Sequence, residues 1–162
     1  MGLFDKLKSK FNRNETIYMP VIGKLISLEA IADGVFSAGI LGIGAGIEPE
    51  EGMVYAPFNG KIVQIADTKH AIGLESENGV ELLIHVGMDT VEMNGKGFDL
   101  LVHEGDSVTK GQKLMSFSMD AIKEAGYRTT IAVIVTNSDQ FESIVVSEEG
   151  KKQLEEVIIQ VG

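Results

Sequence analysis

Two histidines stand where their side chains can do chemistry together. His85 follows the apolar run Leu82–Ile84 and precedes Gly87, so we expect it where a buried strand meets a glycine. A neutral imidazole keeps a lone pair on one ring nitrogen near neutral pH, because its ordinary pKa is about 6.5. His85 therefore qualifies as a nucleophile or a metal ligand. Taken alone, it is better explained as a core or surface histidine without chemistry.

The second histidine, His70, shifts that balance towards a functional site. Asn78-Gly79 is a strong hairpin signal. The strands on either side of this turn should pair antiparallel. His70 and His85 lie at similar distances before and after the turn. The register therefore brings both imidazoles to the same end of one sheet.

The elements that hold these histidines are predicted to be strands. The chain has 162 residues and 19 glycines, and β-branched residues alternate with turn signals. We predict an all-β antiparallel sandwich with one or two short helices, one of them over residues 120–125 and capped by Asp120. Without cysteine there is no disulfide or thiolate chemistry, which fits a reducing cytoplasm. The net charge of −10 argues against nucleic acid as a partner.

Part of the sandwich is predicted to be duplicated. Residues 18–26 (Tyr-Met-Pro-Val-Ile-Gly-Lys-Leu-Ile) match residues 55–63 (Tyr-Ala-Pro-Phe-Asn-Gly-Lys-Ile-Val), with the two tyrosines at Tyr18 and Tyr55. Each copy is predicted to form a strand that contains a proline near its start, then a turn at the glycine, and then a second strand of apolar residues. The fold should therefore contain internally duplicated hairpin units. Residues 105–114 are predicted to form a further glycine-punctuated hairpin.

The N-terminal segment differs from the rest of the chain. Leu3, Phe4, Leu7 and Phe11 share one helical face, and the nearby lysines lie largely off it. We expect residues 1–15 to be a flexible amphipathic segment with a short linker, and residues 16–162 to form a single domain. A basic amphipathic helix can lie on an anionic membrane, although a frayed terminus without function explains the same residues. No apolar run is long enough to span a membrane.

The glycine-rich stretch 33–46 does not match a phosphate-binding loop. It contains neither Gly-x-Gly-x-x-Gly nor a closing Gly-Lys-Ser/Thr. Its glycines are better explained by tight turns and close strand packing. The apolar side chains within it either cap the core or present an exposed patch, and these are Val35, Phe36, Ile40 and Leu41.

With both histidines placed, the chain resembles the glucose-type IIA component of the bacterial phosphoenolpyruvate-dependent sugar phosphotransferase system. The resemblance rests on residues 68–71 (Thr-Lys-His-Ala), the stretch 80–92 around His85, and residues 95–98 (Gly-Lys-Gly-Phe). Residues 56–60, residues 105–108 and the opening Met-Gly-Leu-Phe-Asp-Lys-Leu-Lys add to it. It runs nearly end to end and is weakest after Asp120.

This resemblance implies a phosphotransferase component that acts through a phosphohistidine. His85 would accept a phosphoryl group from the histidine-containing phosphocarrier protein and pass it to a cysteine of a permease's IIB domain. His70 would stabilise the phosphoryl group, Thr68 would orient His70, and the backbone at Gly87 would orient His85. No cofactor is implied, and no metal is required, although the two histidines offer ligands for weak zinc binding. The implied partner-binding residues are Asp33, Val35, Phe36, Ile40, Leu41, Leu83, Val86, Asp89 and Val91.

Two other classes of protein account for some of the same residues. A biotinyl or lipoyl carrier domain has similar hairpins, and Asp67-Thr68-Lys69 superficially fits its modified lysine, but no Met-Lys-Met is present. A zinc hydrolase would use both histidines as ligands. It would need a third protein ligand, and the sequence offers neither a convincing one nor a His-x-His pair.

Overall fold

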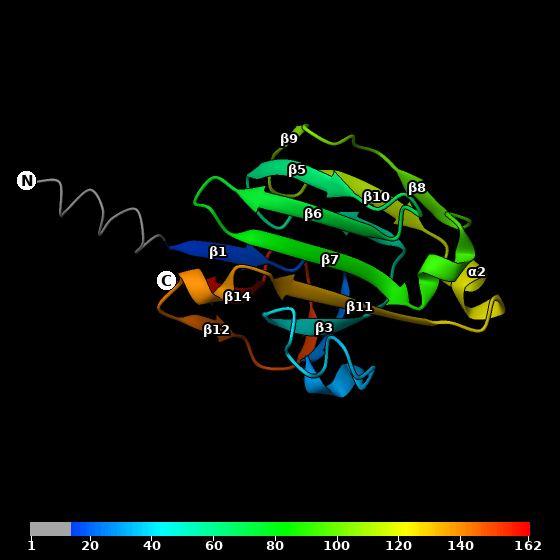
Figure 1. Cartoon of the computed structure of the whole chain (residues 1–162), viewed down its shortest axis with the longest axis horizontal. Coiled ribbons are helices and arrows are strands. Elements are labelled where there is room, and N and C mark those ends of the chain that lie inside the picture. The colour runs from blue at the N-terminus through cyan, green and yellow to red at the C-terminus, as the bar shows by residue number, and fades with distance from the viewer. Residues whose placement is uncertain (1–13) are drawn as a thin grey trace, which may run out of the picture.

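The computed structural model describes residues 14–162, and antiparallel strands dominate it (Figure 1). The all-β prediction is therefore confirmed. The proposed amphipathic segment, residues 1–11, lies outside the described residues, and the first strand, β1, begins at Glu15. No helix within residues 14–162 is long and apolar enough to cross a membrane.

The largest element is an eight-stranded antiparallel sheet that carries both site histidines on or beside its central strands. Its strand order is β13-β2-β3-β11-β7-β6-β5-β9. The bounds are β13 (Gly150–Lys152), β2 (Gly23–Ser27), β3 (Ile43–Pro49), β11 (Arg128–Val135), β7 (Glu81–Met88), β6 (Ala71–Ser76), β5 (Gly60–Ile65) and β9 (Ser107–Val108).

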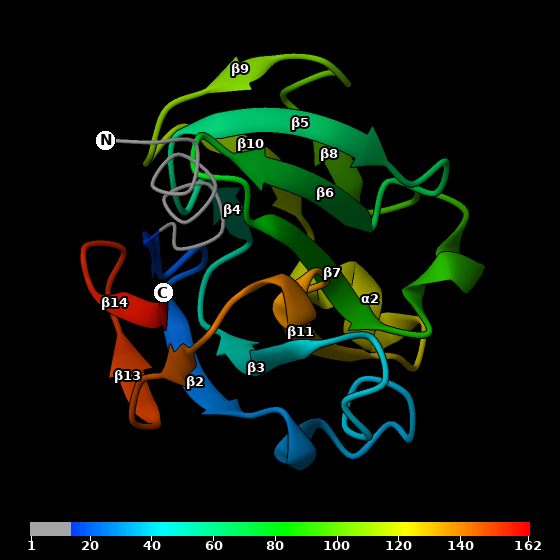
Figure 2. The ribbon, with the colours of Figure 1, turned by 60° about the vertical axis from the view of Figure 1, so that its left-hand side comes forward.

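Two three-stranded antiparallel sheets pack against the eight-stranded sheet, and the core lies between them (Figures 1 and 2). One consists of β1 (Glu15–Tyr18), β14 (Val157–Val161) and β12 (Ile144–Val146); the other of β4 (Met53–Tyr55), β10 (Lys113–Phe117) and β8 (Phe98–Leu100). Both contribute buried side chains to one continuous apolar cluster. The apolar run at residues 129–135 lies within β11, and residues 157–161 form β14.

The helices are short, and one predicted cap was wrong. The α-helix α2 spans Met119–Glu124, and 3-10 turns occur at Glu29–Ile31, Thr90–Met93 and Ser138–Gln140. The N-cap of α2 is Ser118 rather than Asp120, because the Ser118 Oγ accepts a hydrogen bond from the Ala121 N–H at 3.1 Å. Strand β10 ends at Phe117, so Ser118 keeps the extended backbone that an N-cap needs.

The predicted duplication is visible in paired backbone contacts. The Tyr18 N–H donates to the Pro57 carbonyl at 3.0 Å, and the Tyr55 N–H donates to the Pro20 carbonyl at 2.7 Å. The two matching segments therefore bind one another reciprocally. Each begins its second strand, β2 or β5, at the aligned glycine. The repeated sequence thus encodes two equivalent strand–turn–strand units.

The hairpin predicted over residues 105–114 is wrong. Strand β9 pairs with β5 in the large sheet, whereas β10 pairs with β4 and β8 in a small one. The turn between them therefore crosses from one sheet to the other. The glycines of this stretch indicate a turn, but they do not determine whether the strands on either side pair with each other.

A second apolar cluster lies on the outer face of the large sheet, away from the core. Residues 28–42, between β2 and β3, fold back over this face (Figure 2). They contribute to the cluster of Leu28, Ile31, Phe36, Met88, Ala132 and Ile134. Gly46 of β3 makes room for this contact, since a Cβ there would lie 2.8 Å from the Cγ1 atoms of Ile26 and Ile31.

Replacing Gly46 tests this packing. Gly46→Ala should lower the free energy of unfolding by about 1–3 kcal/mol, because the added methyl group overpacks the outer cluster. Gly73→Ala is the matched control, since a Cβ there would meet its nearest atoms at an ordinary 3.6 Å. We expect that control to change stability by less than about 0.5 kcal/mol. Urea unfolding measures both, and equal midpoints for the two variants would contradict this view of Gly46.

Candidate functional site

The hairpin of β6 and β7 brings the two histidines together. Gly79, in the turn, has a φ of +90°, and Ala71 of β6 lies opposite His85 of β7. The Val86 N–H donates to the carbonyl of His70 at 2.7 Å, which fixes the residue just before β6. The two imidazole centroids are 4.6 Å apart, with the rings nearly perpendicular at 82°. The convergence predicted from the Asn78-Gly79 turn is therefore confirmed.

The backbone after His85 fixes its tautomer. The His85 Nδ1 lies 2.8 Å from the carbonyl oxygen of Gly87. A carbonyl can only accept, so Nδ1 must carry the proton and Nε2 must carry the lone pair. Gly87 reaches this position with a φ of +79°. A Cβ there would come within 2.3 Å of Thr90 Cγ2, so the position requires glycine for both its backbone angle and its space.

His70 is held by a side chain rather than by the backbone. Its Nδ1 lies 2.7 Å from the hydroxyl oxygen of Thr68. When that hydroxyl donates, the neutral His70 ring keeps its proton on Nε2. His70 is buried, and its ring also lies near Phe98, with centroids 6.5 Å apart. The arrangement gives a fixed imidazole with one nitrogen left to act as a donor.

Burial keeps both imidazoles neutral. Burial, and after it the neighbouring His70, lower the pKa of His85 to about 4, although hydrogen bonding at Gly87 and the charge of Asp33 oppose the shift. Burial also lowers the pKa of His70, and hydrogen bonding at Thr68 opposes that shift. Near neutral pH the Nε2 lone pair of His85 is therefore available for nucleophilic attack.

Small residues beside His85 recess it into the outer face of the sheet. Ala71, Ala132 and Gly46 continue the row of strand partners that runs through His85. A hollow of about 410 Å³ opens over this region. Its lining consists of Ala32, Asp33, Val35, Phe36, His85, Met88, Asp89, Val91 and Arg128. The hollow leaves room for a group to be attached to His85.

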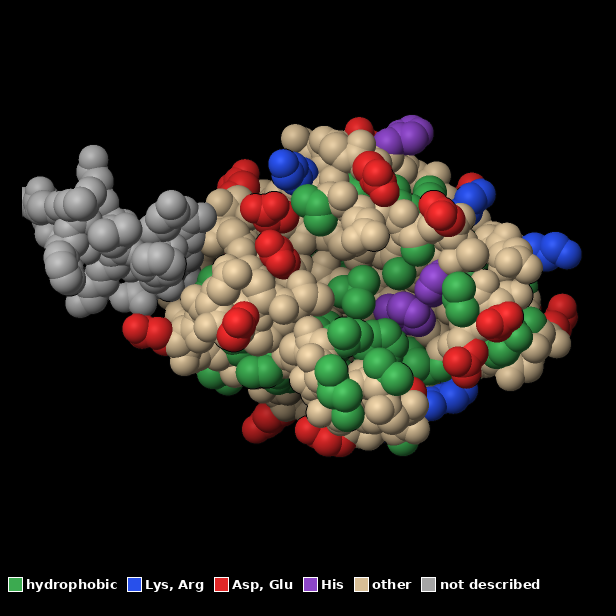
Figure 3. All heavy atoms as spheres, viewed as in Figure 1, with side chains coloured by type: hydrophobic (Ala, Val, Ile, Leu, Met, Phe, Trp, Pro, Cys, Tyr) green, Lys and Arg blue, Asp and Glu red, His purple; other side chains and the backbone are tan. Residues whose placement is uncertain are grey.

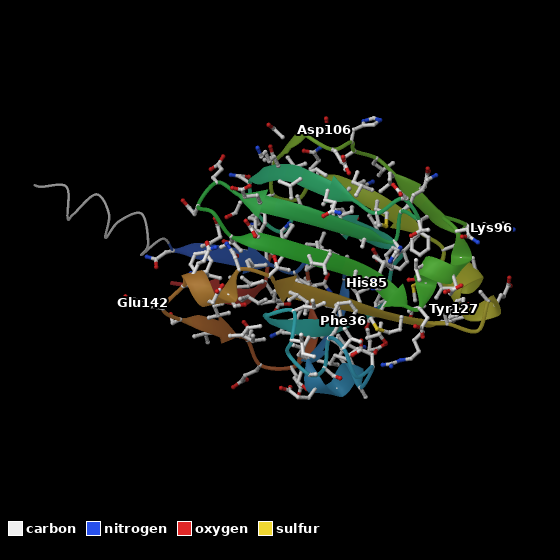
Figure 4. The ribbon with its side chains drawn as sticks, in the orientation of Figure 1. Phe36, His85, Lys96, Asp106, Tyr127 and Glu142 are labelled. Atoms are coloured by element: carbon white, nitrogen blue, oxygen red, sulfur yellow. The ribbon has the colours of Figure 1, made fainter. Side chains whose placement is uncertain are left out.

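Asp33 holds one wall of the hollow. Its carboxylate accepts hydrogen bonds from the backbone N–H groups of Phe36 at 3.1 Å and Ser37 at 2.9 Å. Burial alone would raise the pKa of Asp33, but these bonds lower it below its ordinary value. The turn places the Phe36 ring 4.9 Å from the His85 ring, centroid to centroid (Figure 4). Asp33 therefore positions Phe36 against the nucleophile.

Hydrophobic side chains surround the histidine pair at the surface (Figure 3). Val35, Leu41 and Val91 are exposed, and Ile40 is 78% exposed. Leu83 is half-buried, Phe36 is buried in the outer cluster, and Asp89 is exposed. Val35, Phe36 and Val91 line the hollow. Together with Ile40, Leu41 and Leu83 they make up the apolar surface that we call the rim.

Val86 does not belong to this rim. Its side chain is 0% exposed and packs in the core between the sheets. Alternation along β7 sends Leu82, Ile84 and Val86 inward, and Leu83 and His85 outward. The resemblance implied that Val86 is a partner-binding residue, and its burial in the core contradicts that role.

Sequence reasoning also missed residues that the structure brings to the hollow. Arg128 and Met88 line it, and Ala132 lies between His85 and Gly46 in the sheet. The pairing of β11 with both β3 and β7 brings these positions together. Strand order depends on residues far apart in the sequence, so no local sequence pattern predicted that these residues would meet.

Among residues 14–162, no group of three or more histidine, aspartate, glutamate or cysteine side chains is placed to hold a metal ion. A catalytic zinc site usually draws three ligands from the protein. The described residues therefore do not supply the ligand set that a zinc hydrolase would need.

Known proteins are similar to this chain in both sequence and fold. Residues 15–141 match the family described as phosphoenolpyruvate-dependent sugar phosphotransferase system, EIIA 1. The PTS system glucose-specific EIIA component of Staphylococcus epidermidis is 43% identical over 146 residues, covering 90% of this chain and 87% of that protein. The solved structure of glucose permease IIA from Mycoplasma capricolum has a TM-score of 0.82 and 30% identity, and the match covers 93% of this chain and 97% of that one.

A longer relative contains a similar region as one part of its chain. The PTS system beta-glucoside-specific EIIBCA component of Bacillus subtilis is 47% identical over 145 residues. The match covers 90% of the present chain but only 24% of that relative. The chain therefore spans about a quarter of the Bacillus subtilis protein.

The neutral state of His85 leads to a pH prediction. Its imidazole should titrate near pH 4, well below the ordinary value of about 6.5. Because the folded pKa is the lower one, the unfolded state binds the proton first as the pH falls. His85 should therefore contribute its full stability above about pH 6.5 and lose it progressively towards pH 4.

Histidine NMR titration and urea unfolding at several pH values measure the two effects. His85→Gln should remove this part of the pH dependence of unfolding. A titration of His85 near pH 6.5 in the folded protein would contradict the role assigned to burial.

Proposed function

The chain belongs to the phosphoenolpyruvate-dependent sugar phosphotransferase system EIIA 1 family, and we propose that it carries its phosphoryl group on Nε2 of His85. As a glucose-type EIIA component it is a phosphocarrier in sugar uptake. In the proposed reaction the donor is the histidine-containing phosphocarrier protein. The acceptor is a cysteine on the IIB domain of a sugar permease.

The observation that carries this proposal is the hydrogen bond from His85 Nδ1 to the Gly87 carbonyl. With the proton held on Nδ1, the Nε2 lone pair attacks phosphorus, the N–P bond of the donor histidine breaks, and its electron pair returns to the donor ring. In the second step the cysteine thiolate attacks phosphorus, and the N–P electron pair returns to Nε2. Neither step requires a proton to leave His85. The protein's work is therefore alignment and charge stabilisation.

His70 is proposed to stabilise the transferring phosphoryl group. Its ring lies against that of His85, and the Thr68 hydroxyl holds its Nδ1. A hydrogen bond from His70 Nε2 to a phosphoryl oxygen would offset negative charge that forms between the two ring nitrogens in each transfer. Thr68 acts through His70 and is a positioning residue.

The apolar rim is proposed to dock both partners in turn. Val35 and Val91 are exposed at the hollow, and Ile40 and Leu41 are exposed as well. Such a rim also keeps water away from a labile N–P bond. A IIB partner is supported by relatives whose names join EIIA to EIIB and EIIC in one component. Because the acceptor belongs to a membrane permease, we place the second transfer at the cytoplasmic face of the membrane.

Residues 1–11 are proposed to bring the chain to that membrane through their basic amphipathic pattern. Deleting them should slow transfer to the membrane permease and leave phosphorylation by the soluble donor unchanged. Transfer assays with permease-containing vesicles and with the donor alone measure the two steps. Equal loss in both assays would show that the segment serves the domain rather than the membrane.

The roles of the two histidines can be separated by substitution. With phosphoenolpyruvate, enzyme I and the phosphocarrier present, the wild type should gain one acid-labile, base-stable phosphoryl group by mass, and His85→Ala should gain none. His70→Gln should still accept it, but pass it on about ten- to a hundredfold more slowly, because a charge-assisted contact is lost. His103→Gln, on an exposed loop, is the control and should match the wild type. Phosphorylation of His85→Ala would reverse the assignment.

A further inference from the structure

The hollow over His85 is lined by a positively charged side chain, that of Arg128, which has no role in the reaction proposed above. Its lining includes the carboxylates of Asp33 and Asp89 and the guanidinium-bearing side chain of Arg128. Hydrogen bonds lower the pKa of Asp33, although burial opposes them, so it is ionised near neutral pH. A phosphoryl group on His85 would therefore enter a site that already holds a carboxylate charge. Among residues 14–162, Arg128 is the only lysine or arginine that lines the hollow.

The fold ties the position of Arg128 to the backbone that orients His85. Arg128 is the first residue of β11 and lies opposite Met88 at the end of β7, where the strand register shifts. A Cβ on Gly87 would lie 3.0 Å from the Arg128 carbonyl oxygen. Tyr127, the preceding residue, is labelled near this end of the sheet in Figure 4. Arg128 is thus anchored beside Gly87, and its long side chain reaches the hollow.

The Arg128 side chain is exposed and has no ionic partner in the described part of the chain. The ion pairs within residues 14–162 join His103 to Asp106 and Lys151 to Glu50. Although Asp33 and Asp89 line the same hollow, neither approaches Arg128 closely enough to form a pair. The carboxylate of Asp33 is instead used by the backbone of its own turn. The guanidinium is therefore available to an incoming anion.

We propose that Arg128 binds oxygens of the phosphoryl group carried by His85. This inference rests on the proposed function of His85. A guanidinium suits the task because its donors match two phosphate oxygens at once and because it stays charged at every working pH. It offsets the repulsion between a dianionic phosphoryl group and the two carboxylates of the hollow. It thereby raises the share of phosphoryl groups that rest on His85 rather than on the donor.

The rival assignment for Arg128 is a contact with an acidic side chain of the donor protein. The phosphoryl group is the better match, because Arg128 lines the recess that contains His85 rather than standing apart on the outer rim. The two assignments differ in what they predict for the isolated phosphorylated chain. Only a contact with the phosphoryl group persists after the donor has been removed.

The experiment compares Arg128→Ala and Arg128→Lys with the wild type. Lys61→Ala is the charge-matched control, since Lys61 is exposed on β5 and does not line this hollow. The first measurement is the equilibrium of phosphoryl groups between donor and chain. The second is a pH titration of the isolated phosphorylated chain by phosphorus NMR. Melting temperatures confirm that all variants are folded.

Arg128→Ala should shift the equilibrium towards the donor about five- to tenfold, as for a charged contact that water partly screens. It should also raise the pKa of the phosphoryl group, because the dianion has lost a nearby positive charge. Arg128→Lys should restore part of both effects, and Lys61→Ala should change neither.

Two outcomes would overturn the proposal. One is an equilibrium and a phosphorus titration that are both unchanged in Arg128→Ala. The other is slower transfer with an unchanged titration, which would assign Arg128 to the donor protein. A wild-type chain that gains no phosphoryl group on His85 would instead refute the proposed function itself. The wild-type measurement therefore distinguishes failure of the Arg128 proposal from failure of the proposed function of His85.

Discussion

The hydrogen bond between His85 Nδ1 and the Gly87 carbonyl is the constraint on which the site depends. It joins residues two apart on one strand, and it forms because Gly87 takes a positive φ that turns its carbonyl towards the ring. The surroundings enforce that backbone: the Thr90 hydroxyl bonds to the Val86 carbonyl, and the Arg128 backbone closes the other side. The nucleophile is therefore oriented by the end of β7 itself, with no need for a neighbouring acid.

The large sheet separates stability from chemistry by assigning them to its two faces. Inward-facing side chains of β7 join the apolar core that the smaller sheets complete. The outward face carries His85 among small neighbours, and the chain between β2 and β3 covers part of it with a separate apolar cluster. Phe36 belongs to that cluster and also touches the His85 ring. Packing of the outer cluster thus determines the shape of the hollow as well as contributing to stability.

The sequence was sufficient wherever the determining interaction is local. The Asn78-Gly79 turn predicted the convergence of the histidines, and the matching segments at Tyr18 and Tyr55 predicted units that do bind each other. Proline and glycine made these predictions possible, because each favours particular backbone angles at its own position in the chain.

The failures share a physical cause: they depend on strand order or on which face of a strand is buried. Val86 was expected among the partner-binding residues, although the side chains of β7 alternate between the two faces of the sheet and send Val86 into the core. The strands after Gly105 were expected to pair, but they enter different sheets. Arg128 went unnoticed because only the pairing of β11 with β7 brings it to the hollow. The residues before and after it in the sequence carry no trace of that pairing.

The central claim, that the Gly87 carbonyl leaves Nε2 as the reacting nitrogen of His85, is tested most directly by locating the N–P bond. Phosphorylating a chain with nitrogen-15 in its histidines and recording phosphorus–nitrogen couplings by NMR identifies the bonded nitrogen. We predict that phosphorus couples to Nε2 of His85, while Nδ1 keeps its proton. A phosphoryl group on Nδ1 of His85 would contradict the account, because that nitrogen would have to give up its bond to Gly87.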